Sequence, residues 1–401
     1  MRSKTFGSAL IVAGTTIGAG MVSMPLTSAG MGFGYTVALL VMLWILLCYS
    51  ALLFVEVYQK AERQDAGIAT LAEQYFGMTG RVLATLALVI FMYAILTVYV
   101  LMSSDLISTV LPALTEYGTA ISVIFTVFFA IFIIAGTGHV DIATRLLFIA
   151  KLVAFVVLLF LMLPKVTMDN LMAIPLDKAL LISASPFFFT SFGFHVVIPS
   201  INRYLEGNVA RLRTSIIVGT GLPLALYIMW QMSTHGVLTQ SEFVQILNQE
   251  PTLGGLIKAV THITGSHFIG WSVRLFSLFA LITSFLGVAL ALFDCLDDLL
   301  KRVKIKSNRL SLGLLTFVPV LFFALFYNDF LSVLAFAGQM FTFYGLVLPV
   351  GMVWRARKRY PEMPYRVIGG NISLLIALLL GVLIINVPFL IQAGYLPNVI
   401  G

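Results

Sequence analysis

The sequence predicts an all-α polytopic membrane protein. Of its 401 residues, 60% are hydrophobic and 10% are charged, whereas about a quarter of the residues are charged in an ordinary soluble domain. The apolar residues are gathered into runs of about 20, the length that an α-helix needs to cross the hydrocarbon of a bilayer. Most charged residues fall between these runs. Composition and spacing together exclude a soluble globular domain.

Eleven apolar runs follow one another along the chain. The first begins directly after Met1-Arg2-Ser3-Lys4 and is longer than the apolar region of a cleavable signal peptide, so we expect it to be a retained helix. We expect spanning helices over residues 6–30, 33–56, 82–111, 118–135, 143–163, 179–201, 214–234, 268–293, 311–326, 331–354 and 371–391. The chain is therefore expected to form one membrane domain over residues 1–401.

The basic residues predict how the chain is oriented. An odd number of spans puts the two termini on opposite sides, and 19 of the 24 Lys and Arg residues fall on the side of the N-terminus. The opposite side has three, Lys165, Lys178 and Lys258. Because cytoplasmic loops are enriched in Lys and Arg, we expect a cytoplasmic N-terminus and an external C-terminus. These loops also explain the net charge of +7, so a nucleic acid partner is not expected.

Two spans are interrupted by polar, glycine-containing segments. Residues 14–20 read GTTIGAG and residues 190–193 read TSFG, and each segment is followed by a proline, Pro25 and Pro199. Glycine in a helix interior costs about 0.5–1 kcal/mol relative to alanine, and an opened turn in lipid leaves backbone groups unsatisfied. We therefore expect two discontinuous helices with a ligand at the breaks. The alternative is close helix packing through Gly14-x-x-x-Gly18.

A broken helix suits a zwitterionic amino acid. Exposed N–H groups at a helix N-terminus attract a carboxylate, and exposed carbonyls attract an ammonium group. We expect Gly18, Ala19 and Gly20 to hold the substrate carboxylate and carbonyls of residues 190–192 to accept from its amino group. The full set of expected substrate-binding residues is Thr15, Thr16, Gly18, Ala19, Gly20, Thr190, Ser191, Phe192, Gly193 and Gln339.

The two interrupted spans also suggest an internal repeat. If spans one to five form one unit and spans six to ten another, the second unit enters the membrane from the opposite side, as in many secondary transporters. At an offset of 174 residues, Thr16 aligns with Thr190 and Pro25 with Pro199. We expect repeats over residues 6–163 and 179–354, with an extra helix at 371–391.

The same motifs resemble those of a known family. Residues 14–21 with Met24-Pro25, and residues 190–195 with Ile198-Pro199-Ser200, are similar to bacterial aromatic amino acid permeases of the hydroxy/aromatic amino acid permease family, within the amino acid–polyamine–organocation superfamily. The resemblance covers the whole chain and is greatest to the tyrosine-specific members. It implies a LeuT-like fold and proton symport of an aromatic amino acid, tyrosine above all, by alternating access across the bacterial inner membrane. It implies no cofactor.

Aromatic residues near the breaks suit an aromatic substrate, because rings stack favourably on rings. They lie in the sixth span and in the tenth, around Gln339: Phe187, Phe188, Phe189, Phe192, Phe194, Phe336, Phe341, Phe343 and Tyr344. The alternative is core packing, since the chain has 32 phenylalanines. A phenol also needs one polar partner, and Gln339, Tyr93, Tyr99 and Tyr344 are equal candidates.

Ionisable residues inside spans mark candidates for coupling and gating. Lys151 lies deep in the fifth span. Thr283 and Ser284 resemble the hydroxyl pair that forms a sodium site with first-helix carbonyls in distant relatives of the fold that the resemblance implies. We expect that the Lys151 ammonium could replace this sodium ion and bind and release a proton. The alternative is a lysine that extends to the interface. His195 is a second proton candidate, with a structural role as its alternative.

Two further charges, Asp105 and Arg274, lie in the outer parts of their spans. They could form an ion pair that stabilises the scaffold or closes an outer gate. Glu56, at the end of the second span, is interpreted as an interface residue. The segment 238–267 is expected to form a capping helix over the outer mouth. Its two histidines have no neighbouring carboxylates or cysteines, so no metal site is expected.

The sequence thus favours a secondary transporter over other classes. A membrane enzyme would need acids, bases or metal ligands gathered on neighbouring helices, and the few intramembrane charges are scattered. A channel or receptor for small zwitterions would not require two broken helices in inverted positions. Sodium coupling and a broader amino acid specificity stay open, as do the coupling stoichiometry and the oligomeric state.

Overall fold

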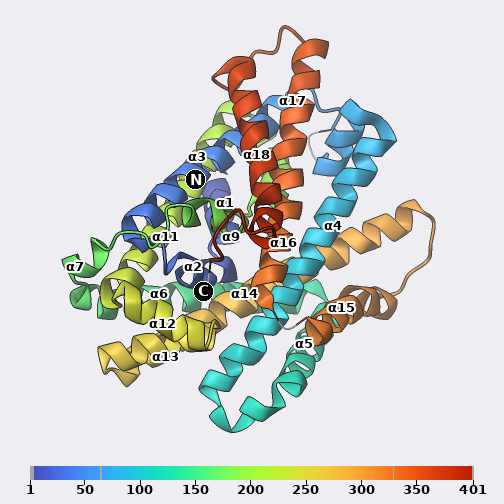
Figure 1. The fold of residues 1–401 in the computed structure, drawn as a ribbon. Helices are drawn as coiled ribbons and strands as arrows, with labels where there is room; N and C mark the ends of the chain where they lie inside the picture. The colour runs from blue at the N-terminus through green and yellow to red at the C-terminus, as the bar shows by residue number, and fades with distance from the viewer. Residues whose placement is uncertain (1–3, 64–65, 328, 400–401) are drawn as a thin grey trace.

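A computed structural model describes residues 4–63, 66–327 and 329–399, with side chains throughout except at residues 137–145. Over this part of the chain the secondary structure is helical and contains no strand (Figure 1). Ten helices are long and apolar enough to cross a membrane, and a pair bent by 52° makes up to eleven. The prediction of an all-α polytopic membrane protein is therefore confirmed.

In the first half of the chain, α4 is much longer than the span that was expected there. α4 begins 14 residues before the predicted span and is bent at Gly77, whose φ of 67° and ψ of −160° lie outside the helical region. The elements are α1 (Lys4–Thr16), α2 (Ala19–Ser28), α3 (Gly32–Tyr58), α4 (Ile68–Val110), η1 (Pro112–Tyr117), α5 (Gly118–Ala135), α6 (Thr137–Met162), η2 (Leu163–Lys165) and α7 (Met168–Leu171).

In the second half of the chain, the sixth span is divided into the short helices α8, α9, η3 and α10. The tenth span is continuous but passes through a π-helical turn, η4, between two α-helical parts. The elements are α8 (Leu180–Ser183), α9 (Ser185–Ser191), η3 (His195–Val197), α10 (Ile198–Tyr204), α11 (Val209–Val237), α12 (Gln240–Gln249), α13 (Leu253–Thr264), α14 (His267–Arg302), α15 (Arg309–Phe326), α16 (Phe330–Thr342), η4 (Phe343–Val347), α17 (Leu348–Arg359) and α18 (Gly370–Gln392).

The interrupted helices lie among the longer helices. α1 packs on α11, α2 packs on α9, and α16 packs on both α4 and α9. The long helix α14 packs on α6 and α4. Fully buried rings fill this region, including Phe188, Phe192, Tyr227 and Tyr344. The burial explains why these breaks can exist, since neighbouring helices rather than lipid surround the exposed backbone groups.

The segment after α11 forms two capping helices instead of the single one expected. α12 ends at Gln249, Pro251 follows, and α13 begins at Leu253. Proline lacks the backbone N–H that a continuing helix requires. Each helix has its own N-cap, because the hydroxyls of Thr239 and Thr252 accept from amides three residues later.

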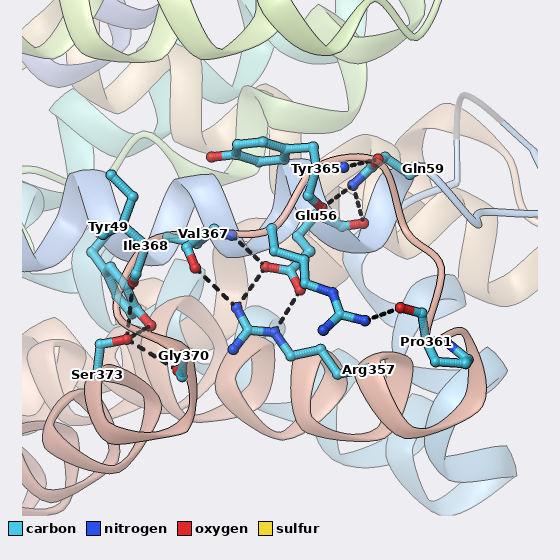
Figure 2. Close-up of polar contacts among 11 residues, drawn as sticks. Tyr49, Glu56, Gln59, Arg357, Pro361, Tyr365, Val367, Ile368, Gly370 and Ser373 are labelled. Atoms are coloured by element: carbon cyan, nitrogen blue, oxygen red, sulfur yellow. Dashed lines mark hydrogen bonds and ion pairs between the residues drawn. The ribbon is translucent and has the colours of Figure 1, made fainter.

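A buried ion pair fastens α3 to α17 and corrects the interpretation of Glu56. The Arg357 guanidinium donates twice to the Glu56 carboxylate, at 2.7 and 2.9 Å, and the side chains are 9% and 0% exposed. The amide of Val367, in the loop after α17, also donates to Glu56 at 2.8 Å (Figure 2). Glu56 is therefore not an interface residue but the centre of a hydrogen-bonded junction between two helices and a loop.

Candidate functional site

The first span is broken at Ile17 and Gly18. α1 ends at Thr16, and Gly18 adopts an extended conformation with φ −145° and ψ −164° before α2 begins. The first amides of a helix have no carbonyl one turn earlier to donate to. One of them, the Ala19 amide, donates instead to the Ser284 hydroxyl of α14 at 3.0 Å. The predicted discontinuity is therefore present.

The sixth span is broken after Ser191. α9 ends there, and helical structure resumes as η3 at His195. Local bonds satisfy part of the exposed backbone, since Thr190 O accepts from the Gly193 amide at 3.1 Å and Phe192 O accepts from the Phe194 amide at 2.8 Å. This break also lies where the sequence predicted it.

The two breaks are in direct contact. The Ser191 hydroxyl donates to Gly20 O at 3.1 Å, and a Cβ atom placed on Gly20 would lie 2.9 Å from Ser191 Oγ. A Cβ atom on Gly18 would lie 2.6 Å from Ser284 Oγ, closer than real Cβ contacts. The segment is therefore an interrupted helix and also a site of close packing at Gly18 and Gly20, whereas a Cβ atom on Gly14 would meet Phe148 at an ordinary 3.5 Å.

Tyr227, on α11, joins the two breaks and was not found from the sequence. Its hydroxyl lies 2.6 Å from Thr16 O at the end of α1 and 2.7 Å from Ser191 O at the end of α9. Its ring packs edge-on against Phe192, with centroids 5.0 Å apart. A tyrosine in an apolar span carries no signal of its partners, so only the structure reveals this bridge.

Lys151 lies where the sequence placed it, between the first and eighth spans. Its side chain is buried, and its ammonium donates to Ile17 O at 2.6 Å and to Thr283 Oγ1 at 3.3 Å. The ring of Phe148 lies 4.8 Å from Nζ. Among the described residues no carboxylate pairs with it. The ammonium therefore lies between a carbonyl oxygen at a helix end and a hydroxyl oxygen, and both are groups that favour a cation.

His195 is fully buried beside the second break. Its Nε2 lies 3.0 Å from the Ser50 hydroxyl, which also donates to Gly345 O in the π-helical turn. Its Nδ1 has no hydrogen-bond partner, and the rings of Phe194 and Phe341 lie 4.6 and 5.4 Å away. These surroundings hold the imidazole between α3 and η4, and no carboxylate of a described residue is bonded to it.

The remaining candidates do not all gather at the breaks. The Thr16 and Thr190 hydroxyls donate to carbonyls one turn earlier in their own helices. Thr15 faces outward on α1 and bonds to Ile11 O. The Gln339 amide donates to Ile385 O of α18 at 2.7 Å. The side chains of Thr15 and Gln339 are thus directed away from the broken segments.

Some of the aromatic residues of the sixth and tenth spans form a cluster centred on Phe341, whereas Phe192 packs on Tyr227 and Phe336 is 44% exposed. The Phe341 ring lies 5.0 Å from Phe189, 5.6 Å from Phe91 and 5.3 Å from Tyr344. Gly193 borders this cluster, since its Cβ would meet Phe91 and Phe341 at about 4 Å. The buried Tyr344 hydroxyl has no partner, whereas the Tyr93 hydroxyl is directed away, to Leu315 O.

Asp105 and Arg274 do not form the expected ion pair in the described part of the chain. The Asp105 carboxylate accepts from the Gly254 amide of α13 at 2.9 Å, and the Arg274 guanidinium lies 5.6 Å from the Trp271 ring centroid. Both line one cavity of about 590 Å³ between α4, α13 and α14. Asp105 does not pair with Arg274 because the N-terminus of α13 offers its carboxylate a nearer hydrogen-bond donor.

Comparison with known proteins adds the family to this geometry. Residues 1–388 match the tryptophan/tyrosine permease family. The chain is 58% identical to tyrosine-specific transport system 1 of Haemophilus influenzae and 56% identical to system 2, with 100% of both chains covered in each case. It is 33% identical to glutamine transporter 2 of Aliivibrio fischeri, over 96% of this chain and 99% of that one.

The apolar spans around two interrupted helices define a polytopic membrane protein, and the family match places it in the permease class. The chain belongs to the tryptophan/tyrosine permease family. The resemblance to aromatic amino acid permeases that the two glycine-containing motifs suggested is therefore confirmed.

Proposed function

We propose that this permease imports tyrosine by proton symport, as a secondary active transporter with alternating access. The observation that carries the proposal is the meeting of two broken helices beside a buried ammonium: Gly20 contacts Ser191, and Lys151 binds Ile17 O one turn away. We place the protein in the bacterial inner membrane with a cytoplasmic N-terminus, because the basic residues are concentrated in the loops on that side.

The substrate is proposed to bind at the ends of the two breaks. The N-terminus of α2 contains the amides of residues 18–20, which favour a carboxylate, and the Ala19 amide would exchange its bond to the Ser284 hydroxyl for one to the substrate. The Thr16 and Ser191 carbonyls, which Tyr227 now bridges, suit an ammonium group. Because α2 and α9 are in contact here, binding requires them to separate. That separation would be one step of alternating access, and the phenyl ring would then meet Phe192 or the cluster around Phe341.

Proton coupling is favoured over sodium coupling by the position of Lys151. Its ammonium already lies between Ile17 O and Thr283 Oγ1, oxygens that would otherwise be ligands for a small cation. If Lys151 loses its proton, the positive charge between these oxygens is lost, and the neutral amine binds Ile17 O after α1 less strongly. His195 stays a second candidate, although the structure gives it only Ser50 as a polar partner.

The architecture is proposed to be a LeuT-like pair of inverted repeats, over residues 6–163 and 179–354, followed by α18. The support is that the first span of each unit is the one that is broken. In such folds the broken helices lie near the middle of the membrane and carry the substrate site.

Tyrosine is preferred to other amino acids on the strength of the similar proteins. Two relatives above 50% identity are named for tyrosine transport. More distant relatives are named for glutamine at 33% identity and for tryptophan at 29%, so substrate choice changes within the family. Tyr344, buried with an unpaired hydroxyl in the aromatic cluster, is the phenol partner we favour.

The experiment is uptake of labelled tyrosine, phenylalanine, tryptophan and glutamine into proteoliposomes. An inward proton gradient is compared with an inward sodium gradient of equal size. We expect tyrosine to accumulate with the proton gradient alone. Accumulation that requires sodium would reject the proton as the coupling ion. Accumulation of none of the four amino acids would reject amino acids of this kind as the substrate.

A further inference from the structure

A second site is built at the basic end of the bundle, away from the broken helices. A pocket of about 320 Å³ is lined by Tyr75 of α4 and by Arg355, Lys358 and Arg359 of α17. Three cations and no carboxylate border it. We propose that this pocket binds the phosphate headgroup of an anionic lipid.

The bend of α4 places the two arginines. The helix bends at Gly77, whose φ and ψ lie outside the helical region, and two carbonyls just before this bend accept hydrogen bonds from α17. Arg355 donates to Tyr75 O at 2.6 Å, and Arg359 donates to Gln74 O at 3.4 Å. A guanidinium has five N–H donors in a planar fork, and these bonds use one donor of each. The remaining donors are therefore held at the pocket and suit the oxygens of a phosphate group.

Aromatic rings fix the directions of the cations. The Arg355 guanidinium lies 4.5 Å from the Phe76 ring centroid, and Lys358 Nζ lies 5.9 Å from that of Trp354. Phe76 is packed so closely on α17 that a Cβ atom on Gly351 would meet it at 3.0 Å. These contacts reduce the freedom of side chains that would otherwise move in solvent, so less entropy is lost when an anion binds.

Among the described residues, no ion pair joins Arg355, Lys358 or Arg359 to a carboxylate. Glu56 is bound by Arg357, and Glu73 is bound by Arg81 at 2.7 Å. Neither carboxylate is left for the pocket cations. Tyr75, which lines the pocket, is 6% exposed, and its hydroxyl has no hydrogen-bond partner among the residues that the structure describes. An unpaired buried donor beside uncompensated cations indicates an anionic ligand.

The neighbouring surface selects a lipid as the source of the phosphate. Directly after the bend, α4 exposes large apolar side chains, with Met78 63%, Val82 47% and Leu83 48% exposed. Trp354, which is 39% exposed, is typical of the headgroup level of a membrane. The pocket thus lies where a lipid-facing surface ends, and basic pockets at this level bind anionic headgroups. Assigning it to the cytoplasmic leaflet rests on the orientation proposed above; the pocket itself does not depend on transport.

The test measures lipid binding to the full-length protein by native mass spectrometry from a neutral detergent. Phosphatidylglycerol, phosphatidylcholine and inorganic phosphate are titrated separately. We expect phosphatidylglycerol to bind more tightly than phosphatidylcholine. In the double variant Lys358→Gln/Arg359→Gln its apparent affinity should fall about 30-fold, since two cations near the headgroup are lost. The charge-preserving variant Lys358→Arg/Arg359→Lys should stay within a few-fold of the wild type.

The matched control is Lys304→Gln/Lys306→Gln, which removes two exposed cations from the loop between α14 and α15. We expect its affinity for phosphatidylglycerol to be unchanged. If both double variants lost affinity for phosphatidylglycerol equally, or neither lost any, the proposal that this pocket binds an anionic lipid would be wrong. Tight binding of inorganic phosphate that the pocket variant alone abolishes would keep the phosphate site but reject the lipid as its source.

Discussion

Lys151 is a single ammonium that joins three elements. It donates to the end of α1 and to α14, and it is carried by α6. If its proton is the coupled one, Lys151→Met should abolish accumulation driven by a proton gradient while tyrosine exchange across the membrane continues. Lys151→Arg should also lose accumulation, because arginine keeps its charge. Uptake and counterflow in proteoliposomes measure the two activities.

The result that would refute this role is accumulation by Lys151→Met with the wild-type dependence on pH. A matched control is available in Lys165→Met, because that lysine lies in η2, directly after α6, is exposed and donates to Thr264 O. It should accumulate tyrosine as the wild type does.

The Tyr227 hydroxyl lies between the two broken helices, within hydrogen-bonding distance of a carbonyl of each. Tyr227→Phe keeps the ring packed on Phe192 but removes the one O–H donor that the two buried carbonyls share, and an unsatisfied buried group costs about 1–3 kcal/mol. We expect both a loss of stability and a change in the KM for tyrosine. Tyr93→Phe removes a comparable bond to Leu315 O, away from the breaks, and should reduce stability without changing KM. An unchanged KM in Tyr227→Phe would remove this residue from the site.

Gly18 is constrained by one atom, Ser284 Oγ. We expect Gly18→Ala to reduce tyrosine uptake at least 10-fold, because overpacking costs about 1–3 kcal/mol. In Gly18→Ala/Ser284→Ala the clash is relieved, since the next atom of Ser284 lies 3.7 Å away, and uptake should recover in part. No recovery, with normal protein abundance, would mean that the hydroxyl bonded to the Ala19 amide matters more than the space.

At the scale of elements, the Glu56–Arg357 pair decides how α3, α17 and the following loop are held together. Breaking a buried pair by removing one partner costs about 3–5 kcal/mol. Glu56→Ala should lower the free energy of unfolding by that amount, and Glu56→Ala/Arg357→Met should be more stable than Glu56→Ala. The exposed pair Asp297–Lys301 is the control, with a loss under about 1 kcal/mol for Asp297→Ala. Unfolding in mixed detergent micelles measures both, and equal losses would contradict the argument.

Most elements could be predicted from the sequence, because hydropathy and length fix where a chain crosses a membrane. Both breaks were predictable as well, since glycine and hydroxyl residues are conspicuous inside apolar runs. Lys151 was found because a charge within a span is rare. The start of α4 could not be placed, because residues 68–77 are too polar to read as a span and too few to show a clear period.

What the sequence could not supply is which side chains meet. Glu56 looked like an interface residue because its partner, Arg357, is 301 positions away. Asp105 and Arg274 were paired by charge alone, whereas a backbone amide of α13 competes for the carboxylate. Gln339 was expected at the site because the rotation of α16 about its axis cannot be read from an almost wholly apolar helix.

For the whole molecule, the orientation is the property that a simple experiment decides. In a variant with Cys48→Ser and Cys295→Ala, a cysteine is introduced by Tyr395→Cys or by Lys306→Cys. Tyr395 is 79% exposed, beyond α18, and should react with an impermeant maleimide on intact spheroplasts. Lys306, in the loop before α15, should react only after lysis. The opposite pattern would invert the proposed topology and move the lipid pocket to the outer leaflet.

The phenol of Tyr227 has one hydrogen to give, yet two carbonyl oxygens lie within 2.7 Å of it. One of the two is always left short of a proton, in a place that water reaches poorly. An ammonium carries three such hydrogens and could serve both oxygens at once. The protein without substrate therefore keeps one carbonyl oxygen at its centre without a hydrogen-bond donor, and a ligand with a primary ammonium group is best suited to satisfy it.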